Sequence, residues 1–243
     1  MNKYIIENLF EFWAFVGKSI GTLVNKNNYK AVIVRESDWP NRIFDVNTKE
    51  MNFDEIIRLS QNNILPDKIT LEKSNILADD SRAQLFLEQG NMALEMNKYS
   101  LQIAEVNNIK QVQSTEDARV FAEIASKSFG YKVDHTIIQK LCVVEWPIKL
   151  FIHWESNQCL GCGIIFFDSN HNAGLHMIGT IPEGRGQGIG TQMVMRLLEE
   201  IKTKSCNFCV LNASKMGEPI YKKLGFQSYG SLETYRILKS EQI

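Results

Sequence analysis

The chain lacks the charge excess that marks a nucleic-acid-binding protein. Its 243 residues carry 27 Lys and Arg against 28 Asp and Glu, a formal net charge of −1, so no basic surface for a nucleic acid is expected. Runs of like charge, which would indicate a polybasic or acidic tail, are missing too. No stretch approaches the ~20 consecutive apolar residues that a membrane-spanning helix needs. The sequence therefore predicts neither nucleic acid nor membrane as a partner, and it gives no indication of the oligomeric state.

The N-terminus lacks the uninterrupted apolar run of a secretory signal. Leu9 to Gly17 is rich in aromatic and aliphatic residues, but Glu11 lies inside this segment and Glu7 lies just before it. A carboxylate within the apolar region of a signal peptide argues against export. We therefore expect a cytoplasmic protein whose first segment, about residues 3–23, is a helix of the folded core.

Two common phosphate-binding motifs are also missing. A P-loop requires Gly-Lys-Ser/Thr, whereas Gly190 is followed by Thr191 and Gln192. A dinucleotide fingerprint requires the spacing G-x-G-x-x-G, whereas Gly186, Gly188 and Gly190 are each two residues apart. These differences exclude a P-loop nucleotide site and a dinucleotide site of the usual kind.

Five cysteines include two C-x-x-C pairs, Cys159 with Cys162 and Cys206 with Cys209. Shared zinc coordination is one interpretation. The pairs are further apart than the ~15–20 residues usual in compact zinc ribbons, and each leads into an apolar run typical of a strand. We therefore expect structural thiols and no metal, and the odd number of cysteines does not favour a disulfide framework.

A glycine-dense turn is the most distinctive feature that is present. An apolar segment from Leu175 to Ile181 leads into four glycines between residues 184 and 190, and a helix with an apolar stripe follows over about 188–203. Glycine lets backbone N–H groups converge, because it has no Cβ and tolerates positive φ. At a helix N-terminus such N–H groups form a site for phosphate. The pattern predicts strand, anion-binding turn, helix.

Alternating patterns predict an α/β protein with a mixed sheet, divided at Asn107-Asn108 into residues 1–107 and 108–243. In the first half, the patterns predict helices over 3–23, 54–61 and 81–89, the last closed by Gly90, and strands over 29–35, 42–46, 68–72 and 92–96. In the second half, they predict strands over 109–112, 148–154, 159–167, 175–181, 208–211 and 229–237. The expected helices there start at the N-cap Ser114, near 135–143, at 188 and at 219.

Two motifs in the second half resemble those of the GCN5-related N-acetyltransferases. The glycine turn reads Arg185-x-x-Gly188-x-Gly190, and Leu211-x-Ala213-Ser214 leads to Tyr221 and Leu224-Gly225-Phe226. The resemblance covers about residues 108–240. It implies the acyl-CoA N-acyltransferase fold over 108–243, preceded by a smaller α/β domain over 1–107.

The resemblance also implies roles for particular residues. The cofactor would be acetyl-CoA. Its pyrophosphate would lie on the turn, and its pantetheine amides would pair with the strand before it and reach Ser214, where many members have Asn. Tyr221 would protonate the leaving thiolate as a general acid. The expected cofactor-binding residues are Ile178, Gly179, Thr180, Arg185, Gly186, Gln187, Gly188, Ile189, Gly190, Thr191 and Ser214.

A base must also take a proton from the amine, which is mostly charged at neutral pH. His176 is the first candidate because it lies on the strand that leads into the turn, and the others are His153, Glu145 and Glu155. The expected reaction is direct transfer of an acetyl group to the primary amine of a small molecule. The alternatives are a catalytically weak acyl-CoA sensor or interaction protein and a protein N-acetyltransferase.

The first half lacks an Arg-x-x-Gly-x-Gly turn, but its element order resembles the later part of the second half. The segment Phe86–Gly90 matches Tyr221–Gly225 in spacing, with phenylalanine in place of the acid. One hypothesis is a degenerate copy of the acetyltransferase-like domain that shapes the acceptor site. An unrelated α+β domain is the alternative.

Overall fold

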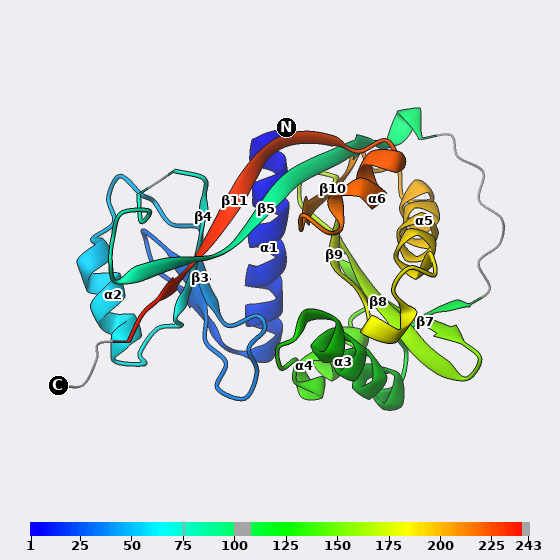
Figure 1. The fold of residues 1–243 in the computed structure, drawn as a ribbon, viewed down its shortest axis with the longest axis horizontal. Coiled ribbons are helices and arrows are strands. Elements are labelled where there is room, and N and C mark those ends of the chain that lie inside the picture. The colour runs from blue at the N-terminus through cyan, green and yellow to red at the C-terminus, as the bar shows by residue number, and fades with distance from the viewer. Residues whose placement is uncertain (75, 100–107, 240–243) are drawn as a thin grey trace.

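The computed structural model describes residues 1–74, 76–99 and 108–239. Within them, all strands join one eleven-stranded mixed sheet (Figure 1). The helices are α1 (Asn2–Ile20), α2 (Phe53–Gln61), α3 (Thr115–Phe129), α4 (His135–Cys142), α5 (Ile189–Lys202) and α6 (Glu218–Lys223), with 3-10 turns η1 (Met96–Lys98) and η2 (Pro182–Gly184). The strands are β1 (Leu23–Asn25), β2 (Lys30–Val32), β3 (Arg42–Phe44), β4 (Lys68–Glu72), β5 (Ala83–Glu95), β6 (Ile109–Gln111), β7 (Ile148–Glu155), β8 (Gln158–Phe167), β9 (Ala173–Thr180), β10 (Phe208–Ala213) and β11 (Gln227–Ile237).

The strand order is β1-β2-β3-β4-β11-β5-β10-β9-β8-β7-β6. From β1 inward, the successive pairs are antiparallel, antiparallel, parallel and antiparallel, ending on β11. From β7 inward, β7-β8 and β8-β9 are antiparallel, β9-β10 is parallel and β10-β5 is antiparallel, so the series of pairs is the same and ends on β5. Apart from β6, which pairs with β7 at the outer edge, each half thus has the same strand order, and the last strand of each half lies beside strands of the other.

The division after residue 107 stays a prediction, because Asn107 lies outside the described residues. The pairing nevertheless joins the two halves closely. β11 pairs with β4 on one side and with β5 on the other, while β5 also pairs with β10. The two halves are therefore not separate sheets.

The prediction of a helix over 81–89 is wrong, because these residues belong to the long strand β5. Ala, Gln, Leu and Glu favour helix locally, but β5 is hydrogen-bonded to β11 along most of its length. This tertiary pairing outweighs the local preference. The match of Phe86 with Tyr221 is therefore also wrong, since Phe86 lies on a strand and Tyr221 lies on α6.

Most other elements of the predicted α/β fold are confirmed. Ser114 caps α3, since its Oγ accepts a hydrogen bond from the Asp117 N–H at 3.0 Å. Gly130 ends α3 in the left-handed region at φ 72°. The three-residue β1 was not predicted.

Helix α1 packs against strands of both halves, as its central place in Figure 1 shows. Its apolar face, including Phe12, Trp13 and Val16, is buried in one large cluster with residues of α3 and α4. Residues of α5 and α6 form a second cluster, and those of α2 a third. The apolar N-terminal segment is therefore part of the folded core. None of the helices in the described ranges is long and apolar enough to cross a membrane.

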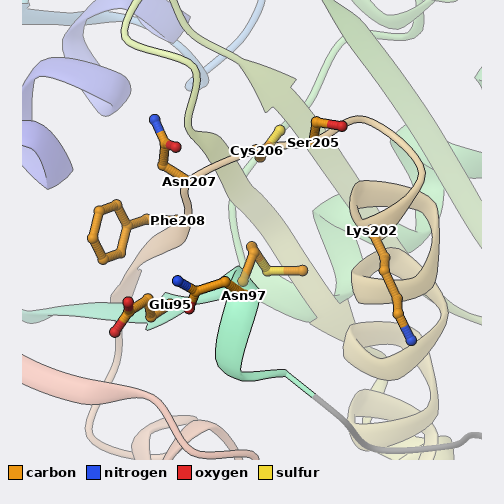
Figure 2. Close-up of a pocket in the computed structure, with 8 residues that line it drawn as sticks. Glu95, Asn97, Lys202, Ser205, Cys206, Asn207 and Phe208 are labelled. Atoms are coloured by element: carbon orange, nitrogen blue, oxygen red, sulfur yellow. The ribbon is translucent and has the colours of Figure 1, made fainter.

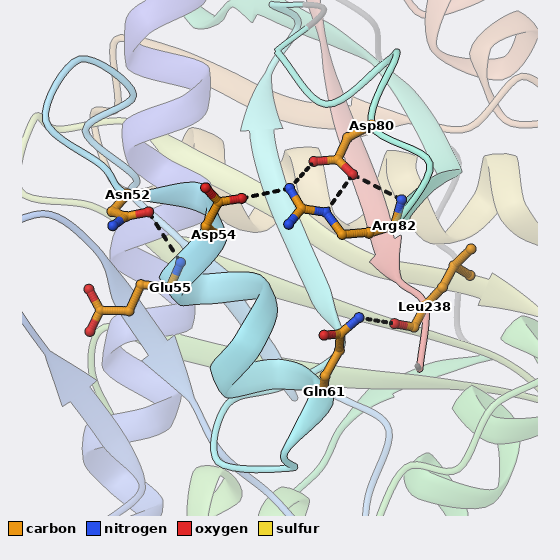
Figure 3. A network of polar contacts seen from close by, with 7 residues as sticks. All are labelled: Asn52, Asp54, Glu55, Gln61, Asp80, Arg82 and Leu238. Atoms are coloured by element: carbon orange, nitrogen blue, oxygen red, sulfur yellow. Dashed lines mark hydrogen bonds and ion pairs between the residues drawn. The ribbon is translucent and has the colours of Figure 1, made fainter. Parts of the chain in front are cut away.

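Polar contacts fasten α2 to the end of the sheet (Figure 3). The Arg82 guanidinium donates to Asp54 and Asp80 at 2.7 Å each. The side chain of Gln61 donates to the carbonyl of Leu238, just after β11. These exposed bonds connect α2 to both β5 and β11, although each contributes little by itself.

Candidate functional site

The two central strands of the C-terminal half separate at one end. Parallel pairing of β9 with β10 covers Ala173 to Leu175 of β9 and ends at Leu211 of β10. β9 nevertheless continues to Thr180 and β10 to Ala213. The last part of β9 therefore has β8 on one side and no paired strand on the other, so an extended ligand with amide groups can bind along its edge.

A β-bulge lies where the strands separate. The register between β8 and β9 shifts between Cys162–Gly179 and Ile164–His176, and Met177 has φ 50°. Gly163 lies opposite the bulge, and a Cβ there would come within 2.8 Å of Ile178 Cδ1. Bulges re-aim a strand next to functional sites. The sequence analysis did not predict this bulge, although a glycine inside a strand is a signal for one.

The predicted turn and helix follow β9 directly. Gly186 and Gly188 have φ of 78° and 81°, and a Cβ at either would meet nothing within 4 Å. Gly188 is the N-cap of α5. Among the described residues, the backbone N–H groups from Gly186 to Thr191 donate to no turn or loop carbonyl. The turn thus presents free N–H groups, with open space before them, at the positive end of a helix dipole.

Arg185 does not extend freely from the turn. Its Nε donates to the carbonyl of Thr180 at 3.4 Å, and its terminal nitrogen donates to the carbonyl of Ser128 on α3 at 3.2 Å. Arg185 therefore ties the turn to β9 and α3. Its positive charge still lies beside the turn, where it favours an anion.

Helix α6 closes the other side of the gap. A Cβ at Gly190 would lie 3.4 Å from Ile220 Cδ1 and 3.7 Å from Thr180 Oγ1, so α5, α6 and the end of β9 meet here. Ser214, at the end of β10, is exposed, and its Oγ accepts a hydrogen bond from the Gly217 N–H at 3.2 Å. The structure thus brings together the ends of β9 and β10, the turn and α6.

Tyr221 is 8% exposed and packs edge-on against Phe226. Burial raises the pKa of the phenol above its usual value, and the nearby thiol of Cys209 adds to the rise. Among the described residues, no hydrogen-bond partner is recorded for its hydroxyl. Tyr221 therefore remains protonated at neutral pH, as a proton donor must before it acts.

His176 lies in surroundings that do not suit a general base. Its ring stacks on Phe12 of α1 at 4.1 Å between centroids, and its Nε2 is 3.0 Å from Asn8 Oδ1. Burial lowers the pKa of His176 to about 3. An imidazole with so low a pKa does not hold a proton taken from an amine near neutral pH. We correct the expectation: His176 fastens α1 to β9.

The other candidate bases lie elsewhere. His153 is buried on β7, with its Nε2 3.1 Å from Gln192 Oε1. Glu155 is exposed at the β7–β8 hairpin, and Glu145 lies in the loop before β7. The structure assigns none of them to the gap between β9 and β10.

A strand separates the two C-x-x-C pairs. Cys162 is on β8 and Cys209 is on β10, with β9 between them as expected. Burial raises the pKa of both thiols. In residues 1–74, 76–99 and 108–239, no three His, Cys, Asp or Glu side chains are arranged to hold a metal ion.

A pocket of about 440 Å³ lies at the opposite end of β10 from the turn (Figure 2). Asn97 of η1, Lys202 at the end of α5 and Asn207 before β10 contribute to its wall. Its position separates it from the turn and from Tyr221, so it is not part of the gap between β9 and β10.

Comparison with known proteins agrees with this geometry. Residues 118–226 match the family model described as the acetyltransferase (GNAT) family. Glucosamine 6-phosphate N-acetyltransferase from Trypanosoma brucei brucei is 29% identical over 87 residues, which cover 33% of this chain and 59% of that protein.

Solved structures show the same fold at low sequence identity. A GCN5-related N-acetyltransferase from Kribbella flavida has a TM-score of 0.66 at 13% identity, covering 94% of this chain and 95% of its own. Another from Sphaerobacter thermophilus has a TM-score of 0.58 at 12% identity, covering 86% and 76%. Residues 118–226, which match the GNAT family model, contain both the separated ends of β9 and β10 and the glycine turn.

Proposed function

We propose that the protein is an acyl-CoA-dependent N-acetyltransferase that transfers an acetyl group from acetyl-CoA directly to the primary amine of a small molecule. The observation that carries the proposal is the turn at the N-terminus of α5, with its free N–H groups beside the unpaired edge of β9. The family of residues 118–226 supports the donor. The Trypanosoma relative, named for a small amine, supports the class of acceptor.

The residues of the site fit a phosphate-bearing acyl donor. N–H groups from Gly186 to Thr191 would hold the diphosphate, with Arg185 adding positive charge. The edge of β9 from Ile178 to Thr180 would bond the amides of the pantetheine arm, with Ser214 across the gap. An N–H of that edge would also stabilise negative charge on the thioester oxygen. Bound there, acetyl-CoA supplies the activated acyl group.

Tyr221 would supply the proton that the leaving thiolate needs. A phenol and a thiolate have comparable proton affinities in water. Because burial raises the pKa of Tyr221, it gives its proton to a thiolate whose own pKa is raised by the same surroundings. The residue that removes the proton of the amine is not assigned. Because no base is assigned and His176 is buried, the second candidate function is a catalytically weak acyl-CoA-binding protein. The cytoplasmic location stays a prediction.

Calorimetry with acetyl-CoA tests the donor site. In Gly188→Trp the new side chain occupies the open space before the turn, so binding should weaken at least ~10-fold. Gly21→Trp is the matched control, because Gly21 has a similar φ of 76° and equally open surroundings at the end of α1. Equal binding by wild type and both variants would contradict the site. No binding by folded wild type would contradict the function.

Turnover by Tyr221→Phe tests the acid and separates the two candidate functions. We expect a fall in kcat of about 10²-fold or more, the usual range for a lost general acid, with unchanged acetyl-CoA binding. Tyr229→Phe, at an exposed tyrosine, is the control. A wild-type protein that binds acetyl-CoA but acetylates no amine in a broad panel would support the weak binder.

A further inference from the structure

Arg42 on β3 is a partly buried cation for which the described protein provides no anion. Its Nε is fully buried and has no hydrogen-bond partner. No ion pair or hydrogen bond to another described residue involves its guanidinium. Other arginines of the described chain without an ion pair, such as Arg35, Arg58 and Arg119, are exposed to water. Arg42 therefore differs from them in lacking both a partner and full hydration.

Such an arrangement is costly for stability. Removing a guanidinium from water without pairing its N–H groups destabilises the folded state. Burial lowers the pKa of Arg42, and Tyr131 is the one group that acts to raise it. Even so, arginine stays charged in proteins. The two terminal nitrogens thus present up to four N–H donors in a plane, the geometry that binds carboxylate and phosphate.

Aromatic and cationic side chains surround this guanidinium. It lies over the ring of Trp13 at 4.3 Å, and Tyr131 stacks on Phe129. The pairing of Ile43 with Ile69 places Arg42 and Lys68 on the same face of neighbouring strands, and Arg236 lies beside Lys68 on β11. Three cations therefore follow one another across β3, β4 and β11.

An acidic group near this row of cations, Asp38, is already engaged. Asp38 acts on the pKa values of Lys68 and Tyr131, and its carboxylate accepts a hydrogen bond from the Lys132 N–H at 2.8 Å. It forms no ion pair with Arg42. The positive charge of the row from Arg42 to Arg236 is thus incompletely balanced, although Asp67 contacts Arg236 at 3.6 Å.

This group of residues is connected to the bulge of the proposed donor site. Tyr131 and Met177 pack on the apolar cluster that contains Trp13. Cys162 acts on the pKa of Tyr131, and its Sγ contacts the carbonyl of Met177 at 3.5 Å. Tyr131 therefore lies near both Arg42 of the N-terminal half and Cys162, which contacts the bulge of the strand whose edge would hold the acyl donor.

We propose that Arg42 binds an anionic group, a carboxylate or a phosphate, of the amine acceptor. The N-terminal half, which has no glycine turn of its own, then determines which amine is used. That the bound anion belongs to the amine acceptor rests on the proposed function, whereas the anion site itself rests on Arg42 alone. The acceptor class is an amino acid or an amino sugar phosphate rather than a neutral amine.

Thermal unfolding with inorganic phosphate tests the anion site without any assay of activity. Phosphate should raise the Tm of Gly188→Trp, in which the turn no longer offers a phosphate site, but should not raise that of Gly188→Trp combined with Arg42→Met. Arg58→Met, at an exposed arginine of α2, should respond like wild type. Without phosphate, Arg42→Met should have an equal or higher Tm, because an unpaired cation has been removed. A lower Tm with an unchanged phosphate response would show a structural arginine and overturn the proposal.

Kinetics with amines that carry a carboxylate, a phosphate or no charge then distinguish the two anions. Arg42→Met should raise KM at least 10-fold for the preferred anionic amine and leave acetyl-CoA binding unchanged. Arg42→Lys keeps the charge without the planar fork, so its KM for the anionic amine should lie between those of wild type and Arg42→Met. It also serves as the test if Arg42→Met does not fold. Equal KM values for all amines in all variants would overturn the proposal. Failure of wild type to bind acetyl-CoA would instead overturn the proposed function and leave the phosphate result standing.

Discussion

His176 and Tyr221 are both almost fully buried, but in different apolar clusters of the C-terminal half. His176 contacts Phe12 and Phe166, which belong to the cluster of α1, α3 and α4. Tyr221 belongs to the cluster of α5 and α6. Burial disfavours the charged form of each: the imidazole stays unprotonated and the phenol stays protonated. At neutral pH His176 is thus a neutral structural group, while Tyr221 retains a proton that it can donate.

The burial of His176 predicts a loss of stability in mild acid. Its pKa is about 3 in the folded protein and about 6.5 when unfolded, so below pH 6.5 the unfolded chain binds the extra proton. Lowering the pH from 7.5 to 5 should therefore reduce the free energy of unfolding by ~2 kcal/mol from this residue. Denaturant unfolding at the two pH values measures the change. His176→Gln should show a smaller dependence on pH, and an identical dependence would contradict the assignment.

Sequence patterns predicted the helix that carries Tyr221 but could not predict the surroundings of His176. The motif around Tyr221 is local, since Leu211 to Phe226 form one strand and one helix. The partners of His176 are Asn8 and Phe12, more than 160 residues away in the chain. Arg42 was missed for the same reason, because its lack of a partner is visible only once the sheet is assembled.

Contact between α1 and β9 depends on a glycine. Asn8 Nδ2 donates to Asp168 Oδ2 at 2.9 Å, while Asn8 Oδ1 lies against His176. Gly174 allows this close approach, because a Cβ there would overlap both Asn8 and His176. The polar contacts of α1 therefore extend from β9 to the turn before it.

Substituting Gly174 should weaken this contact between elements. Gly174→Ala places a methyl group against Asn8 and His176, so we expect a loss of about 1–3 kcal/mol in the free energy of unfolding, as for other overpacked sites. Gly90→Ala on β5 is the matched control, since a Cβ there meets nothing within 4 Å, and its change should stay within about 0.5 kcal/mol. Equal effects of the two substitutions in urea unfolding would show that α1 is not held here.

Periodicity predicted most elements but failed where pairing determines the structure. The helices α3 and α5 have caps and apolar stripes that are visible in the sequence. Strand β5 has a helical composition in its first part and is a strand because β11 and β10 pair with it. β1 has three residues, too few to show a period.

The exchange of β5 and β11 makes each half depend on the other. Without residues 1–107, β10 would lose its neighbour β5, and β11 would lose both of its neighbours. Unpaired strand edges promote aggregation. The repeated strand order supports the hypothesis that the first half is a degenerate copy of the second, and that hypothesis stays a proposal.

Expression of the halves tests this dependence. Residues 108–243 alone should be insoluble or fail to unfold cooperatively, even though they contain the whole glycine turn. Co-expression of residues 1–107 and 108–243 as separate chains should restore a soluble complex, because the strands can still pair. Solubility and thermal unfolding are the measurements. A stable, monomeric C-terminal fragment that binds acetyl-CoA would contradict the role of β5.

The place of β11 also has a consequence for synthesis on the ribosome. The strand that lies between β4 and β5 is made last, some 130 residues after β5 itself is complete. Until residues 227–237 leave the exit tunnel, the strand between β4 and β5 is missing, and both of these strands have an exposed edge. Such non-local pairing slows folding and exposes the nascent chain to aggregation. Chaperones that shield strand edges therefore have the longest opportunity to act on the first half of this protein, although it is the first to emerge.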